Sequence, residues 1–204
     1  LDHGYYEAFN RDNVHLVDVK HEEPIEAITE DGVKTTRAEH AFDIIVFATG
    51  FDALTGALDR LEIRGADGES LKDKWHGGPK TLMGVATAGY PNFFMITGPQ
   101  APFANLPTTI ENDIKWITRC ISFMEDEGYD AGVPTQEAED AWARHSKEVI
   151  DHTVMKYGDA ANTWFLGANI PGKGPQILIY FGGAQNYFDM LQESADSGFP
   201  EMRF

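Results

Sequence analysis

The sequence predicts an α/β fold in which buried strands alternate with amphipathic helices. Three short runs, residues 44–48, 93–96 and 177–181, are almost entirely apolar, and each is followed closely by a glycine. Unbroken apolar runs of this length are typical of strands covered on both faces of a parallel sheet. Two longer segments, residues 107–128 and 135–156, have the apolar spacing or the charge order of helices.

The start of the chain predicts a small antiparallel meander. Residues 14–19 form a β-rich run, and residues 24–29 alternate apolar and polar side chains as a half-exposed strand does. Residues 30–32 are a turn signal, so residues 33–38 are expected to form the return strand. We expect a domain boundary near Ala41, where the meander passes into the first buried run.

The clearest predicted helix begins near Pro107 and ends at Gly128. Thr108 or Thr109 is the expected N-cap residue. Apolar side chains recur every three or four residues along this helix and predict one buried stripe, formed by Ile110, Ile114, Ile117, Ile121 and Met124. Cys120 lies beside the stripe and has no basic neighbour in the sequence, so we expect it to have a packing role.

Two further helices are expected. The first, residues 135–156, has acidic side chains near its start and basic ones near its end, the order that the helix dipole favours. The second covers residues 186–195. Residues 161–176 contain glycine and proline and lack a clear period, which predicts a loop.

Length and charge limit the classes of function. The chain has 204 residues, of which 42% are hydrophobic, enough for one or two domains. Its formal net charge of −17 disfavours nucleic acid and anionic membranes as partners, and no apolar run reaches the roughly 20 residues of a membrane span. One cysteine permits no intrachain disulfide, and this fits a cytoplasmic protein. The histidines and the cysteine show no metal-ligand spacing, so no metal site is expected.

Two segments that follow predicted strands are candidate ligand sites. Residues 48–50 place a small residue and a glycine at a strand end, where backbone can approach a ligand or simply turn. Residues 98–107 join a strand to a helix N-terminus, where unpaired N–H groups suit a phosphate or the pyrimidine edge of a flavin. The alternative is a stiff connection whose Phe103 and Leu106 fill the core.

A third candidate is the loop from Thr163 to Lys173. It carries Trp164, Phe165 and Leu166, which are costly to leave in water. These side chains are expected to cover either the core or a bound cofactor. The sequence contains no GxGxxG fingerprint, no P-loop and no GxSxG elbow, so it lacks the phosphate-binding loop that a free-standing dinucleotide-binding enzyme needs.

Taken together, these blocks resemble one family. They are residues 5–14, residues 43–53, residues 98–107, and residues 164–173 followed by 180–183. In this order they are similar to the class B flavoprotein monooxygenases of Baeyer–Villiger type, a family that includes cyclohexanone and phenylacetone monooxygenases. The resemblance covers essentially the whole chain.

The resemblance implies an incomplete, C-terminal part of a flavoprotein with two Rossmann-like dinucleotide-binding domains. Residues 1–41 would be the tail of the NADP-binding domain. Residues 42–204 would be the closing part of the FAD-binding domain, including a mobile control loop at residues 159–176. The family's two fingerprints and its catalytic arginine would lie before Leu1, in the missing N-terminal part of the same polypeptide. No catalytic residue is therefore expected in this chain, and the isolated chain is expected to be inactive.

The family's reaction, and the roles of residues in it, also follow from the resemblance. FAD is reduced by NADPH and reacts with O₂, and one oxygen atom is inserted next to a ketone carbonyl to give an ester or a lactone. Residues implied to contact the cofactors are Thr49, Gly50, Asn105, Leu106, Trp164, Asn169 and Lys173. Residues implied to line the ketone pocket are Phe103, Ala104, Asn105, Leu106 and Ile179.

Two alternatives stay open. A related flavoprotein could oxygenate nitrogen or sulfur instead of a ketone. A non-catalytic interaction domain would explain the missing fingerprints.

Overall fold

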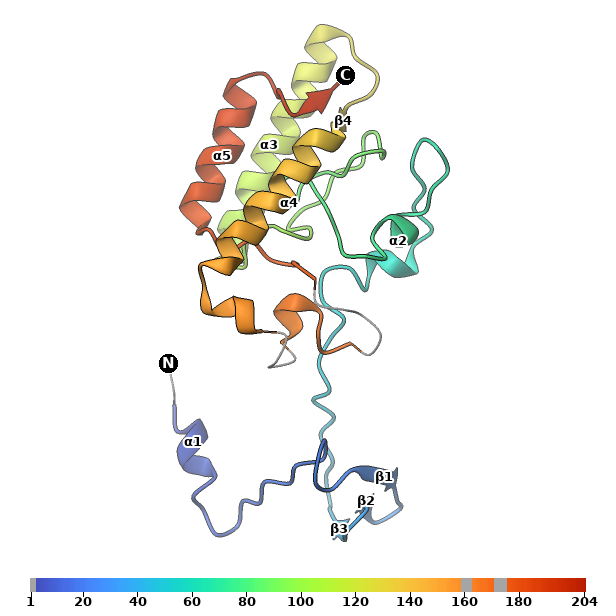
Figure 1. The fold of residues 1–204 in the computed structure, drawn as a ribbon, viewed down its shortest axis with the longest axis vertical. Helices are drawn as coiled ribbons and strands as arrows, with labels where there is room; N and C mark the ends of the chain where they lie inside the picture. The colour runs from blue at the N-terminus through green and yellow to red at the C-terminus, as the bar shows by residue number, and fades with distance from the viewer. Residues whose placement is uncertain (1–2, 159–162, 171–175) are drawn as a thin grey trace. The chain divides into compact units, whose positions relative to one another are not determined.

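The computed structural model describes residues 3–158, 163–170 and 176–204. Contacts divide the chain into two compact units, residues 1–49 and residues 50–204. The division falls later in the sequence than the boundary expected near Ala41. Each unit is described by itself below, and Figure 1 gives the element labels.

The first unit contains a short helix and a three-stranded meander. Helix α1 spans Tyr5–Ala8, and strands β1 (Ile25–Ile28), β2 (Gly32–Thr35) and β3 (Glu39–Ala41) pair antiparallel in the order β1-β2-β3. The predicted meander is therefore confirmed for residues 24–38. Residues 14–19, however, form no strand, and β3 is the third strand instead.

Packing within the meander explains two of its residues. A Cβ atom at Gly32 would overlap the carbonyl oxygen of His40 on the neighbouring strand, so the pairing of β2 with β3 requires glycine there. The Thr35 hydroxyl donates a 2.6 Å hydrogen bond to Glu23, whose carboxylate lies 3.2 Å from the His40 ring. These contacts tie β2 and β3 to the segment that precedes β1.

The first predicted buried strand is wrong for this chain. Residues 44–48 are extended but form no strand, and the side chains of Ile44, Val46 and Phe47 are 80%, 80% and 69% exposed. A strand of a parallel sheet needs a neighbouring strand for its hydrogen bonds. Within the part of the chain that the structure describes, no segment pairs with these residues.

The frame of the second unit is formed by its long helices (Figure 1). They are α3 (Leu106–Glu127), α4 (Gln136–Asp151) and α5 (Ala184–Asp196). Their shared core contains Trp116 and Cys120 from α3, Trp142 from α4, and Tyr187 and Leu191 from α5. Trp116 donates a 3.1 Å hydrogen bond from its indole N–H to Ser194, and this bond fixes α3 against α5.

Shorter elements complete the second unit. They are the 3₁₀ turns η1 (Leu58–Arg60), η2 (Val154–Tyr157) and η3 (Trp164–Leu166), helix α2 (Leu71–Lys74), and strands β4 (Val133–Pro134) and β5 (Met202–Arg203). Strands β4 and β5 pair antiparallel and tie the end of the chain to the start of α4.

The long predicted helix is confirmed, but its predicted buried stripe is only partly right, since Met124 is buried and Ile117 packs against the core while Ile114 and Ile121 are exposed. Helix α3 ends at Gly128, which has a φ of 75°. The side chains that α3 buries are Thr109, Asp113, Trp116, Cys120 and Met124, whereas Ile114 and Ile121 are 44% and 41% exposed. The helix has two apolar faces, and the face bearing Trp116 is the one that finds partners on α5.

Helix ends differ from the sequence expectations in smaller ways. Asn105, not Thr108 or Thr109, occupies the N-cap position of α3, and its side chain makes no capping hydrogen bond. Thr135 caps α4 by accepting a 3.2 Å hydrogen bond from the Ala138 N–H. Helix α4 ends at Asp151, before the predicted Lys156, because the chain continues there as η2.

The other two predicted strands are only partly formed. Residues 93–96 make one isolated antiparallel bridge, between Phe94 and Ala86, and residues 177–181 make one parallel bridge, between Tyr180 and Pro102. Burial was predicted correctly for the last run, since Leu178, Ile179 and Tyr180 are at most 3% exposed. The ladder is missing because the described residues supply no further strand beside either run.

Candidate functional site

The loop of residues 98–107 has an anchored half and an exposed half. Residues 98–102 are buried. The Gln100 N–H donates to the Leu178 carbonyl at 2.8 Å, and the Tyr180 N–H donates to the Ala101 carbonyl at 3.1 Å. Residues 103–106 are exposed and lead directly into α3. A rigid base therefore presents four residues, two of them large and apolar, to whatever lies in front of the loop.

The exposed half of this loop touches the tryptophan-bearing loop. The rings of Phe103 and Trp164 are 5.5 Å apart and nearly perpendicular, and the ring of Phe165 lies 6.0 Å from Phe103. Edge-to-face geometry of this kind is favourable for aromatic pairs. Thr163 starts the turn that carries Trp164, because its hydroxyl accepts a hydrogen bond from the Phe165 N–H. The two predicted segments therefore share one surface.

A third segment joins the same surface. The side-chain amide of Asn169 donates a 3.0 Å hydrogen bond to the carbonyl oxygen of Phe51. Gly50, with a φ of 86°, lines a cavity of about 360 Å³ together with Phe51, Ala53 and Trp164. Phe51 is 84% exposed and Trp164 is 36% exposed, so the cavity has large apolar walls that face outward.

One polar atom near this surface has no hydrogen-bond donor among the described residues. It is the Oδ1 atom of Asn169, which is buried. A buried carbonyl oxygen without a donor is costly. Asn169 is not among the residues that line the cavity, so this atom does not by itself mark a ligand contact.

The predicted site residues fall into three sets. Contacts bring together Gly50, Phe103, Trp164 and Asn169, and Ala104, Asn105 and Leu106 are the exposed residues that follow Phe103 in its loop. Ile179 is 2% exposed and does not line the cavity next to Trp164. Thr49 is exposed and belongs to the first compact unit. Lys173, and most of the expected loop at residues 159–176, lie outside the described residues.

Sequence reasoning missed several residues of this surface. Phe51 and Ala53 lie in the block of residues 43–53 and have no predicted role, although their place shortly after Gly50 is a usable signal. Phe165 was expected only to cover a ligand or the core. The contact between Asn169 and Phe51 spans more than a hundred residues of chain, and no local pattern announces it.

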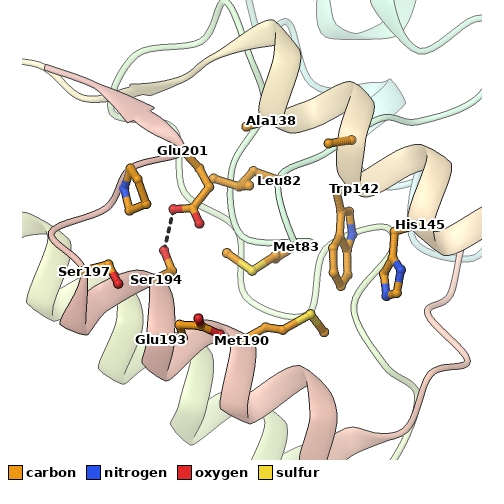
Figure 2. Close-up of a pocket in the computed structure, with 12 residues that line it drawn as sticks. Leu82, Met83, Ala138, Trp142, His145, Met190, Glu193, Ser194, Ser197 and Glu201 are labelled. Atoms are coloured by element: carbon orange, nitrogen blue, oxygen red, sulfur yellow. Dashed lines mark hydrogen bonds between the residues drawn. The ribbon is translucent and has the colours of Figure 1, made fainter.

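A second cavity, of about 390 Å³, lies between α4 and α5 and contains none of the predicted site residues (Figure 2). Its apolar walls include Leu82, Met83, Trp142 and Met190. At its polar end the Ser194 hydroxyl donates a 2.7 Å hydrogen bond to the Glu201 carboxylate. No group of metal-ligating side chains occurs among the residues that the structure describes.

The site fits part of a flavin or nicotinamide cofactor and not the whole of one. Apolar side chains and exposed backbone suit the ring systems and their amide edges. Dinucleotide phosphates are usually held by a glycine-rich turn at a helix N-terminus, and the sequence has no such fingerprint.

Of the described helices, none is long and apolar enough to cross a membrane.

No family model matches the sequence. A Baeyer–Villiger monooxygenase of Pseudooceanicola batsensis is 41% identical over 200 residues, which are 98% of this chain and 36% of that protein. A phenazine N-monooxygenase of Lysobacter antibioticus is 41% identical over 196 residues, or 96% of this chain and 36% of that protein. A cyclohexanone 1,2-monooxygenase of an Acinetobacter species is 42% identical over 187 residues, or 91% of this chain and 34% of that protein.

Solved structures give the same result. The closed crystal structure of a cyclohexanone monooxygenase matches with a TM-score of 0.89 and 44% identity, over 99% of this chain and 38% of that one. A Rhodococcus cyclohexanone monooxygenase bound to NADP⁺ matches with a TM-score of 0.88 and 40% identity, over 98% of this chain and 37% of that one. The chain thus spans little more than a third of the length of the proteins it matches.

Proposed function

From the premise that this chain is a homologue of part of the Baeyer–Villiger monooxygenases, we propose that it forms the cofactor-covering part of such an enzyme. The reaction would be the insertion of one oxygen atom of O₂ next to a ketone carbonyl, giving an ester or a lactone. The observation that carries this proposal is the contact between Phe103 and Trp164, which joins the two loops into one wall.

FAD and NADPH would supply the redox chemistry, by passing electrons from the nicotinamide through the flavin to O₂. The structural neighbours include a cyclohexanone monooxygenase bound to NADP⁺ and a complex with FAD and NADP. In this chain, Gly50, Asn105, Leu106, Trp164 and Asn169 would hold the ring systems of these cofactors.

The second task of these residues would be to exclude water. Phe103 and Trp164 form an aromatic pair at the rim of the exposed loop, and Phe165 packs on both. Reduced oxygen bound in such a site is lost as hydrogen peroxide when water enters, so a dry, closable wall raises the yield of oxygenated product. Phe103, Ala104, Asn105 and Leu106 would also line the ketone pocket.

The remaining assignments follow from the same homology. Residues 1–41 would close the NADP-binding domain, and residues 42–204 would close the FAD-binding domain, with Thr49 and Lys173 near the cofactors and Ile179 behind the pocket. The phosphate-binding loops and the catalytic arginine would come from the share of the relatives' length that this chain does not span. A cytoplasmic location fits the single cysteine.

A second candidate function is oxygenation at nitrogen. The observation that favours it is the phenazine N-monooxygenase, which is as similar to this chain as the Baeyer–Villiger enzyme of Pseudooceanicola batsensis is. Both reactions need the same protected flavin site, so the wall described above serves either. They differ in the substrate that the pocket admits.

Product analysis of the full-length enzyme decides between the two. The FAD-loaded protein, given NADPH and O₂, is offered cyclic ketones, aryl ketones and phenazine, and the products are identified by mass spectrometry. Esters or lactones from the ketones support the proposal. N-oxide as the only product would overturn it in favour of the second candidate, and a protein that binds no FAD would overturn both.

A matched pair of variants tests the wall itself. Trp164→Ala should raise the fraction of NADPH that ends as hydrogen peroxide and lower the yield of product, because it opens the rim next to Phe103. Tyr157→Ala removes another exposed aromatic side chain, which is 67% exposed and does not touch Phe103, and should leave the product yield unchanged. Equal uncoupling in the two variants would argue against a covering role for Trp164.

A further inference from the structure

Asp113 is a fully buried carboxyl group that contacts two separate segments of the chain. It lies on α3 and is 0% exposed. Its Oδ2 atom accepts a 2.8 Å hydrogen bond from the Thr97 N–H, and its Oδ1 atom lies 2.7 Å from the Tyr187 hydroxyl on α5. No ion pair with Asp113 occurs among residues 3–158, 163–170 and 176–204. A buried carboxylate without a cation is costly.

The hydrogen-bond distances around Asp113 can all be satisfied only if the Asp113 carboxyl group itself carries a proton. The Tyr187 hydroxyl lies 2.9 Å from the Met83 carbonyl oxygen as well as 2.7 Å from Asp113, but it has only one proton to donate. If Asp113 were ionised, either its Oδ1 or the Met83 carbonyl would lack that donor. If Asp113 is protonated, it donates to Tyr187, Tyr187 donates to Met83, and Thr97 still donates to Asp113.

We propose that Asp113 is a positioning residue that works as a neutral acid, linking Thr97, Tyr187 and Met83 and thereby fixing the base of the loop at residues 98–107. The idea that Asp113 affects cofactor binding rests on the proposed function, because the loop at residues 98–107 is the one proposed to face the cofactors. The hydrogen bonds from Thr97 through Asp113 and Tyr187 to Met83 do not depend on that function, since all of these residues lie in the second unit.

Backbone conformation shows why the link is needed. Thr97 and Met83 have φ angles of 50° and 49°, in the left-handed region that residues other than glycine rarely adopt. Such conformations persist only where surrounding contacts hold them. Asp113 holds Thr97 directly and Met83 through Tyr187, and the loop begins at the residue that follows Thr97.

The electrostatics agree with a neutral acid. Burial raises the pKa of Asp113, and the hydrogen bonds from Tyr187 and Thr97 offset this only in part. Burial, followed by the proximity of Asp113, holds the pKa of Tyr187 well above its ordinary range. Tyr187 is the titratable group that faces Asp113, since the contacts from Thr97 and Met83 come from the backbone.

Two substitutions separate a neutral acid from a carboxylate. In Asp113→Asn the amide N–H can donate to Tyr187 while the amide oxygen accepts from Thr97, which reproduces the protonated acid. Asp113→Ala removes both bonds. At neutral pH we expect the asparagine variant to melt no lower than the unsubstituted protein and to keep the slow hydrogen exchange of the Thr97 amide. In the alanine variant the melting temperature should fall by roughly 5–10 °C and the Thr97 amide should exchange at least about tenfold faster.

The controls keep the inference testable. Asp126→Asn changes an exposed carboxyl group near the end of the same helix and should leave both readouts unchanged. Carboxyl ¹³C NMR of the unsubstituted protein, assigned by loss of the signal in Asp113→Asn, should show Asp113 still protonated at a pH at which exposed carboxyl groups are already ionised. An ionised Asp113 signal, or an asparagine variant as damaged as the alanine variant, would overturn the inference. None of these measurements needs a flavin. The proposed function can therefore be wrong while Asp113 is a neutral acid, and Asp113 can be ionised while the proposed function is right.

Discussion

Two regions of this molecule are equally apolar in sequence and opposite in structure. In the helical core Trp116 and Tyr187 are 1% and 0% exposed, whereas in the stretch after the meander Ile44 and Phe51 are 80% and 84% exposed. The core residues find partners on α3, α4 and α5 of the same unit. The exposed ones follow a strand pattern but have no neighbouring strand among the described residues. Apolar sequence therefore predicts burial only where the chain also supplies the partner.

The largest loss of stability should come from truncating a large buried side chain of the helical core. Trp116→Ala removes a ring that packs edge-on against Phe94 and Phe199 and also removes the donor to Ser194. We expect it to lower the free energy of unfolding by about 4–5 kcal/mol. Ile44→Ala, in the exposed stretch, should change it by less than about 0.5 kcal/mol. Urea denaturation of both variants measures the contrast, and similar losses would mean that the exposed stretch is packed after all.

The next effect concerns the buried ion pair of the second unit. Glu139 is 0% exposed, lies 3.0 Å from Lys74, and accepts hydrogen bonds from the Thr87 hydroxyl and the Ala88 N–H. Glu139→Gln leaves the Lys74 ammonium without its partner and should cost about 3 kcal/mol.

The exposed pair of Lys80 and Asp140 is the matched control for Glu139. Its charges lie 2.7 Å apart, but the lysine side chain is 54% exposed. Lys80→Met should cost less than about 1 kcal/mol in the same denaturation experiment. A larger loss than in Glu139→Gln would show that burial does not separate the two pairs.

The sequence predicted the helices far better than the buried strands. Helices near residues 107–128 and 186–195 and the stop at Gly128 depend on local chemistry, and the structure has them. The three buried strands depend on hydrogen bonds to neighbours, and they formed only as single bridges or as an unpaired extended stretch.

The candidate site was predictable only in part, because several of its contacts also join residues that are far apart in the sequence. The aromatic pair of Phe103 and Trp164 lay in two segments that family resemblance had already brought together. The contacts of Asn169 with Phe51 and of Asp113 with Tyr187 join distant residues that match no motif. The buried face of α3 was misassigned because counting isoleucines does not reveal which of two apolar faces meets α5.

The pH dependence of stability should distinguish Asp113 from surface carboxylates. Because its folded pKa is raised above the ordinary value of 3.8, folding binds a proton that the unfolded chain releases. Its stabilising contribution is complete below about pH 3.8 and is lost as the pH rises toward the folded pKa. The unfolding free energy of the unsubstituted protein, minus that of Asp113→Asn, should therefore fall with rising pH. A difference that grows with pH would contradict a raised pKa.

The smallest effect is expected on the outer face of α3. Ile121 is 41% exposed although its neighbour Cys120 is fully buried. Ile121→Ala should cost only about 0.5–1 kcal/mol, because a large part of its apolar surface stays in water in the folded protein. Cys120 gives an independent check in the same region. Burial raises the pKa of its thiol to about 11, so a thiol reagent at pH 8 should label it only after the protein is unfolded.

The contact between Phe103 and Trp164 is the point on which the functional account depends most directly. Nuclear Overhauser effects between the Phe103 ring protons and the Trp164 indole protons report that distance in solution. At a centroid separation of 5.5 Å, strong cross-peaks are predicted. If the Trp116–Phe199 cross-peaks of the core are present and those between Phe103 and Trp164 are not, the two loops do not form one wall, and the proposed site is wrong.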